Sequence, residues 1–227
     1  MIVTIDGPAG AGKSTVAQRL ADQLTEKSDK TFEYLDTGSM YRAVALLGVR
    51  SGIDWQISEQ LELLAQSAVV NIIDGQTLLN GEDVTEAVRS LTVTENTRFA
   101  ADNPVIRHMM VEQQRNIAQT FLAENKGLVT EGRDQGTVVF PDADCKFFLT
   151  ATPEERTQRR LGELQQRGIA GDFDEIYRQI MDRDAQDSAR PVGPLCEPPD
   201  AHRIVSDGMT LEEVVERLAE ICYTVVP

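Results

Sequence analysis

The sequence predicts an α/β fold in which a parallel sheet is flanked by helices. Short apolar and β-branched runs alternate along the 227-residue chain with segments of helical period, which is the order of parallel strands joined by crossover helices. The first run, residues 2–5, leads through a glycine-rich loop directly into a helical segment, residues 15–27. Over residues 68–84 the pattern changes to that of a hairpin, so we also expect a small antiparallel sheet inserted in the alternation.

The glycine-rich loop after the first strand carries the strongest motif of the chain. It reads Gly7-Pro8-Ala9-Gly10-Ala11-Gly12-Lys13-Ser14, followed by Thr15, and fits G-x-x-x-x-G-K-[ST]. Its glycines allow positive φ angles and a close approach of the backbone to a ligand. The loop amides offer partial positive charge to phosphate, Lys13 can reach the β- and γ-phosphates, and the Ser14 hydroxyl can ligate Mg²⁺. The motif therefore predicts a P-loop NTPase core that binds a nucleoside triphosphate.

The first half of the chain continues the alternation and contains the insert. We expect a helix over 15–27, a strand over 31–35, helices over 40–51 and 58–67, strands over 68–73 and 76–79, a short piece around Val84, and helices over 86–102 and 104–124. Asp74-Gly75 and Asn80-Gly81 are turn signals between the short strands. Asn103 and Pro104 are typical of a helix N-cap and its first residue.

The second half of the chain returns to the parallel pattern. We expect strands over 127–131, 145–149 and 202–205, a helix starting at Pro153, a break over 168–171, a helix over 173–187, an irregular stretch over 188–200, and an amphipathic helix over 211–221. The polar stretches 7–14, 36–42 and 131–134 all follow strands. Ligands bind beyond the carboxyl ends of parallel strands, so we expect these stretches to converge in space.

The composition narrows the classes of partner. The formal net charge of −15 disfavours binding to nucleic acid or to an anionic membrane, since both need a basic surface. Cys145, Cys196 and Cys222 lie far apart without a C-x-x-C pattern and are expected to be free thiols. No targeting peptide is expected before the loop, and no apolar run approaches the ~18 residues of a membrane span. We therefore expect a cytoplasmic protein with neither nucleic acid nor membrane as a partner.

The arginines are placed where they could serve phosphoryl transfer. Arg42, Arg107 and Arg133 follow or could face strand ends, Arg156, Arg159 and Arg160 share one helix face, and Arg183 and Arg190 flank the irregular stretch. This set suggests one cluster for a second phosphorylated substrate and another that closes over the transferred group, although surface ion pairs are the alternative for any single arginine. Phosphoryl transfer needs positioning and charge neutralisation rather than a side-chain nucleophile. Glu131 ends an apolar strand and could either hold Mg²⁺ through water or only cap the next turn.

Several stretches together resemble a known family. They are Ile5-Asp6-Gly7-Pro8-Ala9-Gly10-Ala11-Gly12-Lys13-Ser14-Thr15, Leu35-Asp36-Thr37-Gly38-Ser39-Met40-Tyr41-Arg42, residues 132–143 from Gly132-Arg133-Asp134, and Arg183-Asp184 through Asp187, Ser188, Arg190, Pro194 and Leu195. In these stretches and their order the chain resembles the bacterial cytidylate kinases, in the nucleoside monophosphate kinase group. The hairpin over 68–84 is similar to the extra nucleotide-binding segment of the bacterial type.

The resemblance implies transfer of the γ-phosphoryl group of ATP to CMP or dCMP, with Mg²⁺ and by a monomer. It implies that residues 7–15 bind ATP with Arg159 and Arg160, that Ser14 ligates the metal, and that Lys13, Arg133, Arg160 and Arg190 are catalytic. The CMP site would consist of Thr37, Tyr41, Arg42, Arg107, Arg133, Asp134, Arg183, Asp187 and Arg190, with Asp134 and Arg107 on the cytosine edge. One departure is Arg98, which stands where the family has a serine that touches the base.

The resemblance also implies how a single kinase domain is divided. The core would comprise residues 1–37, 125–152 and 200–227, the CMP-binding insert residues 38–124 including the hairpin over 68–84, and the lid residues 153–190. Because glycines at 168 and 171 break the chain between two helices, we expect this lid to be mobile and to close on the nucleotides.

Other functions remain open from sequence alone. The phosphate-binding motif is also compatible with a kinase of UMP, of another nucleoside monophosphate or of a shikimate-like acceptor. A GTPase switch is disfavoured because the sequence contains neither N-K-x-D nor D-x-x-G. A nucleic-acid-binding ATPase is disfavoured by the negative charge.

Overall fold

A five-stranded parallel sheet forms the centre of the structure. The computed structural model describes residues 1–73, 75–166 and 168–225. The strands lie in the order β2-β6-β1-β7-β8, and all four neighbouring pairs are parallel. They are β1 Ile2–Asp6, β2 Phe32–Asp36, β6 Gly127–Gly132, β7 Cys145–Thr150 and β8 His202–Val205. The predicted parallel sheet is thus confirmed, and the carboxyl ends of its strands lie along one edge.

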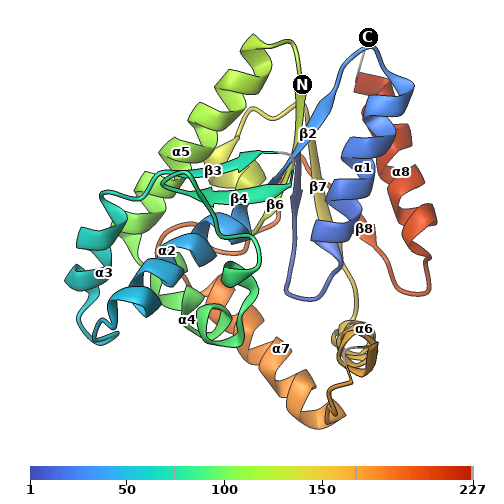
Figure 1. Cartoon of the computed structure of the whole chain (residues 1–227). Coiled ribbons are helices and arrows are strands. Elements are labelled where there is room, and N and C mark those ends of the chain that lie inside the picture. The colour runs from blue at the N-terminus through green and yellow to red at the C-terminus, as the bar shows by residue number, and fades with distance from the viewer. Residues whose placement is uncertain (74, 167, 226–227) are drawn as a thin grey trace.

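Helices cover both faces of this sheet (Figure 1). On one face α1 (Lys13–Lys27) and α8 (Leu211–Val225) pack side by side, and on the other lies α5 (Pro104–Ala123). Val3, Ile5 and Phe147 are completely buried between the sheet and the pair of helices. Burial on both faces explains why the central strands read as continuous apolar runs rather than as alternating ones.

The insert forms a second hydrophobic core beside the sheet. It consists of α2 Thr37–Ser51, α3 Ser58–Ala65, β3 Val70–Ile73, β4 Gln76–Leu79, β5 Glu82–Asp83 and α4 Leu91–Ala101, and it packs against α5. The three strands β3-β4-β5 are antiparallel, which confirms the predicted small sheet. Of the two predicted turns, Asp74 lies outside the described residues, whereas Asn80 and Gly81 both adopt positive φ, at 51° and 84°.

Three local predictions were wrong in their boundaries. Helix α2 starts at Thr37 rather than at Met40, because the Asp36 carboxylate accepts a hydrogen bond from the Ser39 amide at 2.9 Å and caps it. The helix expected over 86–102 is divided, since Ser90 is extended between a 3₁₀ turn and α4. No helix is predicted between the strands over 127–131 and 145–149, but the chain forms one π-helical turn there, η2, over Gln135–Val139.

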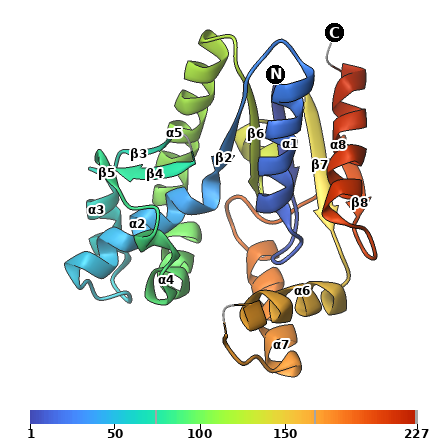
Figure 2. The same cartoon turned by 45° about the vertical axis from the view of Figure 1, so that its right-hand side comes forward.

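Two helices lie beyond the carboxyl edge of the sheet, below the loop that joins β1 to α1 (Figure 2). They are α6 (Pro153–Gln166) and α7 (Phe173–Ser188), and Arg167 between them lies outside the described residues. Asp172 caps α7 by accepting a hydrogen bond from the Glu175 amide at 2.9 Å. In this arrangement α6 and α7 lie next to the stretches 7–14, 36–42 and 131–134, which the sequence predicts to converge. No helix in the described part of the chain is long and apolar enough to cross a bilayer.

Candidate active site

The phosphate loop, residues 7–14, is shaped by tight backbone packing at the end of β1. A Cβ added to Gly7 would lie 2.0 Å from the carbonyl oxygen of Leu149, so only glycine fits there. Gly10 and Gly12 adopt positive φ angles of 76° and 84°. Gly12 is the N-cap of the 15-residue helix α1 and supplies no side-chain cap. The loop therefore presents the N-terminus of a long helix, which favours an anion such as phosphate.

Lys13 is buried at the centre of this loop. Its side chain has little contact with solvent, and its Nζ donates a hydrogen bond to the carbonyl of Pro8 at 2.8 Å. Burial, and after it the positive charge of Arg133, lowers the pKa of Lys13 to about 7. A nearby anion would favour the charged ammonium form, so the site is electrostatically suited to phosphate.

Ser14 and Glu131 form an oxygen-rich pair beside Lys13. The Ser14 hydroxyl donates to Oε1 of Glu131 at 2.8 Å, and the Thr37 hydroxyl donates to the Glu131 carbonyl at 2.7 Å. Close by, burial and then the charge of Glu131 raise the pKa of Tyr34 above its usual value. The structure thus joins the phosphate loop to the ends of β6 and β2, as the sequence predicts.

Arginines from different parts of the chain gather at the same edge of the sheet. Arg133 donates to the Asp187 carboxylate at 2.6 Å, and Arg190 lies 2.5 Å from the other oxygen of Asp187. Burial alone would raise the pKa of Asp187, but the charges of Arg133 and Arg190 outweigh it and hold that pKa below its usual value. Arg42 pairs with Asp36 at 2.8 Å. This network joins the end of β6 to the end of α7.

Arg183 differs from the other arginines of the cluster. Within the described residues it makes no ion pair, although α7 places it among cationic neighbours. Although Arg183 is exposed to solvent, the atoms packed around it and then the charge of Arg133 lower its pKa, with Arg190 and Arg42 contributing. The cluster, consisting of Arg42, Arg133, Arg183 and Arg190, therefore carries positive charge that its carboxylates do not fully balance. Such an arrangement is suited to a second phosphate-bearing ligand.

Arg107 and Asp134 form a buried ion pair next to this cluster. Their side chains are only 3% and 5% exposed, and Nη2 of Arg107 contacts Oδ2 of Asp134. Nη1 of Arg107 donates to the Ala101 carbonyl at 3.0 Å, and the guanidinium lies 5.4 Å from the centre of the Tyr41 ring. Among the described residues, Oδ1 of Asp134 accepts no hydrogen bond and Nε of Arg107 donates none. One acceptor and one donor of the pair thus have no partner within the chain.

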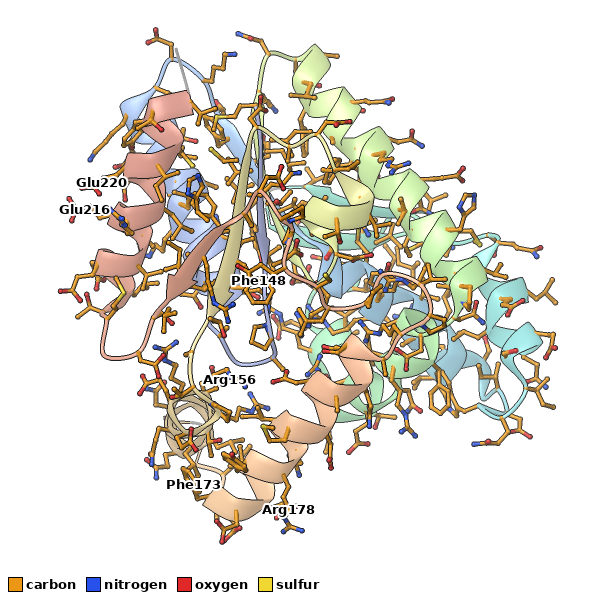
Figure 3. All side chains as sticks on the ribbon, turned by 180° about the vertical axis from the view of Figure 1, so that it is seen from behind. Phe148, Arg156, Phe173, Arg178, Glu216 and Glu220 are labelled. Atoms are coloured by element: carbon orange, nitrogen blue, oxygen red, sulfur yellow. The ribbon has the colours of Figure 1, made fainter. Side chains whose placement is uncertain are left out.

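The predicted lid arginines have different surroundings. Arg156 is buried and projects from α6 toward the phosphate loop (Figure 3), where its Nη1 donates to the Ala9 carbonyl at 2.9 Å and to Asp184 at 2.5 Å. The same Asp184 accepts a hydrogen bond from the Ala9 amide at 3.1 Å. Arg159 donates to Ser206 and lies near Gly12, whereas Arg160 pairs with Glu163 on its own helix. The structure therefore brings Arg156 and Arg159 to the loop, but not Arg160.

Arg98 lies on the exposed side of α4. Its guanidinium carbon is 4.8 Å from the centre of the Phe99 ring, and Phe99 in turn packs against Trp55 with ring centres 5.2 Å apart. In this position Arg98 makes no ion pair with another described residue. Its relation to a bound base stays a prediction.

Comparison of the sequence with known proteins assigns the chain to a family. The family model described as "Cytidylate kinase" matches residues 3–224. The chain belongs to the cytidylate kinase family. A curated "Cytidylate kinase" of Rhodopirellula baltica is 45% identical over 221 residues, which cover 97% of this chain and 92% of that protein.

Further similarities concern part of a larger protein and the fold alone. The chain is 44% identical to a "Bifunctional pantoate ligase/cytidylate kinase" of Synechococcus elongatus over 97% of its own length, but it spans only 41% of that protein. An uncharacterised protein from Eubacterium ventriosum has a solved structure with a TM-score of 0.50 at 12% identity, covering 99% of this chain and 98% of that one. This second similarity shows that the fold is shared.

The structure also gives places in this site to residues for which the sequence analysis predicted no role. Gly193 passes directly over the buried ion pair, with φ +62°, and a Cβ there would lie 2.1 Å from Nη2 of Arg107. Asp184 bridges α7 to the phosphate loop. Asp6 holds the backbone after Asp134 through its carboxylate. A sequence signal existed for Asp6, because it is an acid at the end of an apolar strand, but its partner on η2 could not be read from spacing.

Proposed function

We propose that the chain is an ATP-dependent kinase that transfers the γ-phosphoryl group of ATP to CMP or dCMP, giving ADP and CDP or dCDP. Membership of the cytidylate kinase family supports this activity, as does the 45% identity to a curated cytidylate kinase. The single observation that carries it is the convergence of the phosphate loop, the arginine cluster and the buried Arg107–Asp134 pair at one edge of the sheet. A shikimate-like acceptor is not favoured, because it has no base that the Arg107–Asp134 pair could recognise.

On the donor side, residues 7–15 bind the ATP phosphates through backbone amides, and Lys13 places its charge on the group being transferred. Ser14 and Glu131 offer oxygen atoms 2.8 Å apart, which fit a hard divalent cation such as Mg²⁺. Ser14 would hold the ion directly and Glu131 through water. When bound, the ion neutralises charge on the β- and γ-phosphates.

On the acceptor side, the arginine cluster binds the phosphate of CMP. An oxygen of that phosphate attacks the γ-phosphorus while the bond from the γ-phosphorus to the bridging oxygen of ADP breaks. Arg133 and Arg190, together with Lys13, neutralise the charge that spreads over the transferred group. Asp187 holds these arginines and meets the ribose, while Thr37, whose hydroxyl is fixed on the end of β6, lies beside the phosphate.

The buried ion pair selects the base. The unpaired Oδ1 of Asp134 is an acceptor that suits the N4 amino group of cytosine, and Arg107 is a donor that suits its N3 or O2. The ring of Tyr41 packs against the guanidinium of Arg107. Burial is the main cause that raises the pKa of Tyr41 to about 12, so its hydroxyl stays neutral. Uracil presents the opposite polarity at these positions and would leave buried groups unmatched.

The division of the chain belongs to the same proposal. Residues 1–37, 125–152 and 200–227 form the core, residues 38–124 the CMP-binding insert, and residues 153–190 a lid that brings Arg159 and Arg160 onto ATP. The last two residues of the core range lie outside the described part of the chain. The monomeric state stays a prediction. The cytoplasmic location stays a prediction.

A coupled ADP-release assay tests this function directly. Purified protein is given Mg²⁺-ATP with CMP, dCMP, UMP, AMP or shikimate in turn. We expect CMP and dCMP to give the highest kcat/KM, with UMP at least about tenfold lower because one buried mismatch costs ~1–3 kcal/mol. Faster turnover of UMP, AMP or shikimate would assign the chain to another acceptor.

A further inference from the structure

Asp6 joins the phosphate loop to the turn that carries the acceptor-binding residues. It is the last residue of β1, directly before Gly7, and it is completely buried. Its Oδ1 accepts a hydrogen bond from the Gln135 amide at 2.8 Å, and its Oδ2 accepts one from the Gly136 amide at 2.7 Å. These amides are the first two after Asp134, so each oxygen of one carboxylate holds one peptide unit of the turn.

The turn held by Asp6 is packed tightly on its other sides. A Cβ added to Gly136 would lie 3.0 Å from both the Pro198 side chain and the Thr4 hydroxyl, so the backbone sits close against its neighbours. The Gln135 side chain accepts a hydrogen bond from Thr130 at 3.0 Å. The turn is therefore fixed from two directions, by strand side chains and by the Asp6 carboxylate.

The surroundings of Asp6 both oppose and stabilise an ionised carboxylate. Burial raises the pKa of Asp6 to about 7, whereas the two amide hydrogen bonds and the charge of Lys13 lower it and Asp134 raises it. A buried carboxylate is stable only where donors satisfy it, and the donors here are backbone groups of the acceptor-binding turn. Keeping this acid in a β-strand core has no packing advantage over an apolar residue.

We propose that Asp6 is a positioning residue for base selection, which fixes the backbone after Asp134 so that Arg133 and Asp134 face the acceptor nucleotide. The inference rests on the proposed function, because it concerns how the same site recognises CMP. Asp6 itself touches neither substrate. Its position before Gly7 also gives the ATP-binding loop and the CMP-binding turn a common support.

The test compares Asp6→Asn with the matched control Thr4→Val. Asparagine accepts at one position but turns a donor toward the second amide, so one hydrogen bond is lost. Thr4 lies on the same face of the same strand and is equally buried, but its hydroxyl makes no hydrogen bond to any residue that the structure describes. For Asp6→Asn we expect faster hydrogen exchange at the amides of Gln135 and Gly136, a KM for CMP raised about tenfold or more, and a narrower ratio of kcat/KM for CMP over UMP. The KM for ATP should change less, and Thr4→Val should leave the ratio unchanged.

The outcomes separate this inference from the proposed function. If Asp6→Asn exchanges faster at these amides but keeps the full CMP-over-UMP ratio, the positioning role is overturned. If wild-type protein does not phosphorylate CMP, the proposed function fails, while the exchange data still report whether Asp6 holds the turn. Should Asp6→Asn not fold, Asp6→Ser, a smaller side chain that can accept one bond, replaces it. In wild-type protein both amides should be protected like strand amides, and exchange at the rate of an open loop would overturn the inference.

Discussion

At the residue scale, the proposed catalytic role of Lys13 depends on its charge in a buried site. Its ammonium is held by the Pro8 carbonyl at 2.8 Å in a site whose burial lowers its pKa to about 7. Lys13→Met removes the charge but keeps much of the side-chain volume. Because the lysine acts most strongly on the charge that develops during transfer, kcat should fall at least about a hundredfold while the affinity for CMP changes little. Steady-state kinetics and CMP titration measure these quantities, and near-normal turnover would remove Lys13 from the mechanism.

Besides the base selection proposed for it, Asp134 neutralises the buried Arg107. Asp134→Asn keeps the shape but replaces a pure acceptor with a group that can also donate to O4 of uracil. The CMP-over-UMP ratio of kcat/KM should therefore narrow, mainly through loss on CMP. The variant should also lose stability, by ~3–5 kcal/mol at most, since Arg107 remains buried without its partner.

Asp200→Asn is the matched control for Asp134→Asn. Asp200 pairs at 2.7 Å with Lys146, which is also buried and whose side chain lies beside Gly136, whereas Asp200 itself is exposed. This variant should lower the melting temperature without changing the CMP-over-UMP ratio. If Asp134→Asn likewise depresses both substrates equally and leaves the ratio unchanged, Asp134 does not read the base.

The sequence could predict most of the residues of this site but not their partners. The phosphate loop and the polar ends of β2 and β6 were readable because each combines a fixed motif with a strand end. Gly193 was not readable, since its positive φ and its approach to Arg107 depend on how the stretch after α7 folds back over the core. The partners of Asp6 and Asp184 could not be predicted either, because both side chains accept hydrogen bonds from backbone amides far away in the sequence.

At the scale of elements, the boundaries that were missed depend on competition between local signals. Helix α2 begins at Thr37 although Gly38 disfavours a helix, because the Asp36 cap and the Arg42–Asp36 ion pair both stabilise its first turn. The helix predicted over 86–102 is interrupted at Ser90, where the chain turns so that Val88 and Val93 can both enter the insert core. Apolar periodicity indicated the burial of these residues but could not show a turn between them.

The first turn of α6 and the last turns of α7 meet at the phosphate loop. Arg156 and Asp184 bind each other and both contact Ala9, through its carbonyl and its amide respectively. We therefore expect Asp184→Asn to raise the KM for ATP about tenfold with little change in the KM for CMP, because a charge-assisted bond that orders the loop is weakened. Asp182→Asn, an exposed change on the same helix, is the control and should leave both values unchanged. An effect confined to CMP would show that Asp184 does not act through the loop.

At the scale of the whole molecule, ion pairs connect the insert, the core and helix α7. Arg190 contacts both Asp187 at the end of α7 and Asp102 after α4, at 2.5 and 2.6 Å. Arg133, after β6, shares Asp187 with it. Binding of CMP phosphate to this network would thus act on all three parts at once, which is how a ligand can favour a closed arrangement.

If residues 153–190 close over the nucleotides, the movement should be confined to the part that lies beyond Arg156 and Asp184. Because Arg156 and Asp184 already contact Ala9, we expect the movement to lie in the end of α6 and the first turns of α7. Arg160 lies in this segment and pairs only with Glu163 among the described residues, so it can reach ATP when the segment moves inward.

Hydrogen exchange with and without nucleotides measures this motion. We expect exchange over residues 160–182 to slow several-fold when an ATP analogue and CMP are both bound, and less when either is bound alone, because only the pair brings the two phosphate groups together. Helix α8, which packs on the far side of the sheet, is the internal control and should not change. Arg160→Ala should lower kcat more than it raises the KM for CMP, since its contact is made only after closure. Exchange over residues 160–182 that does not depend on nucleotides would mean that α6 and α7 keep the arrangement described above when both nucleotides are bound.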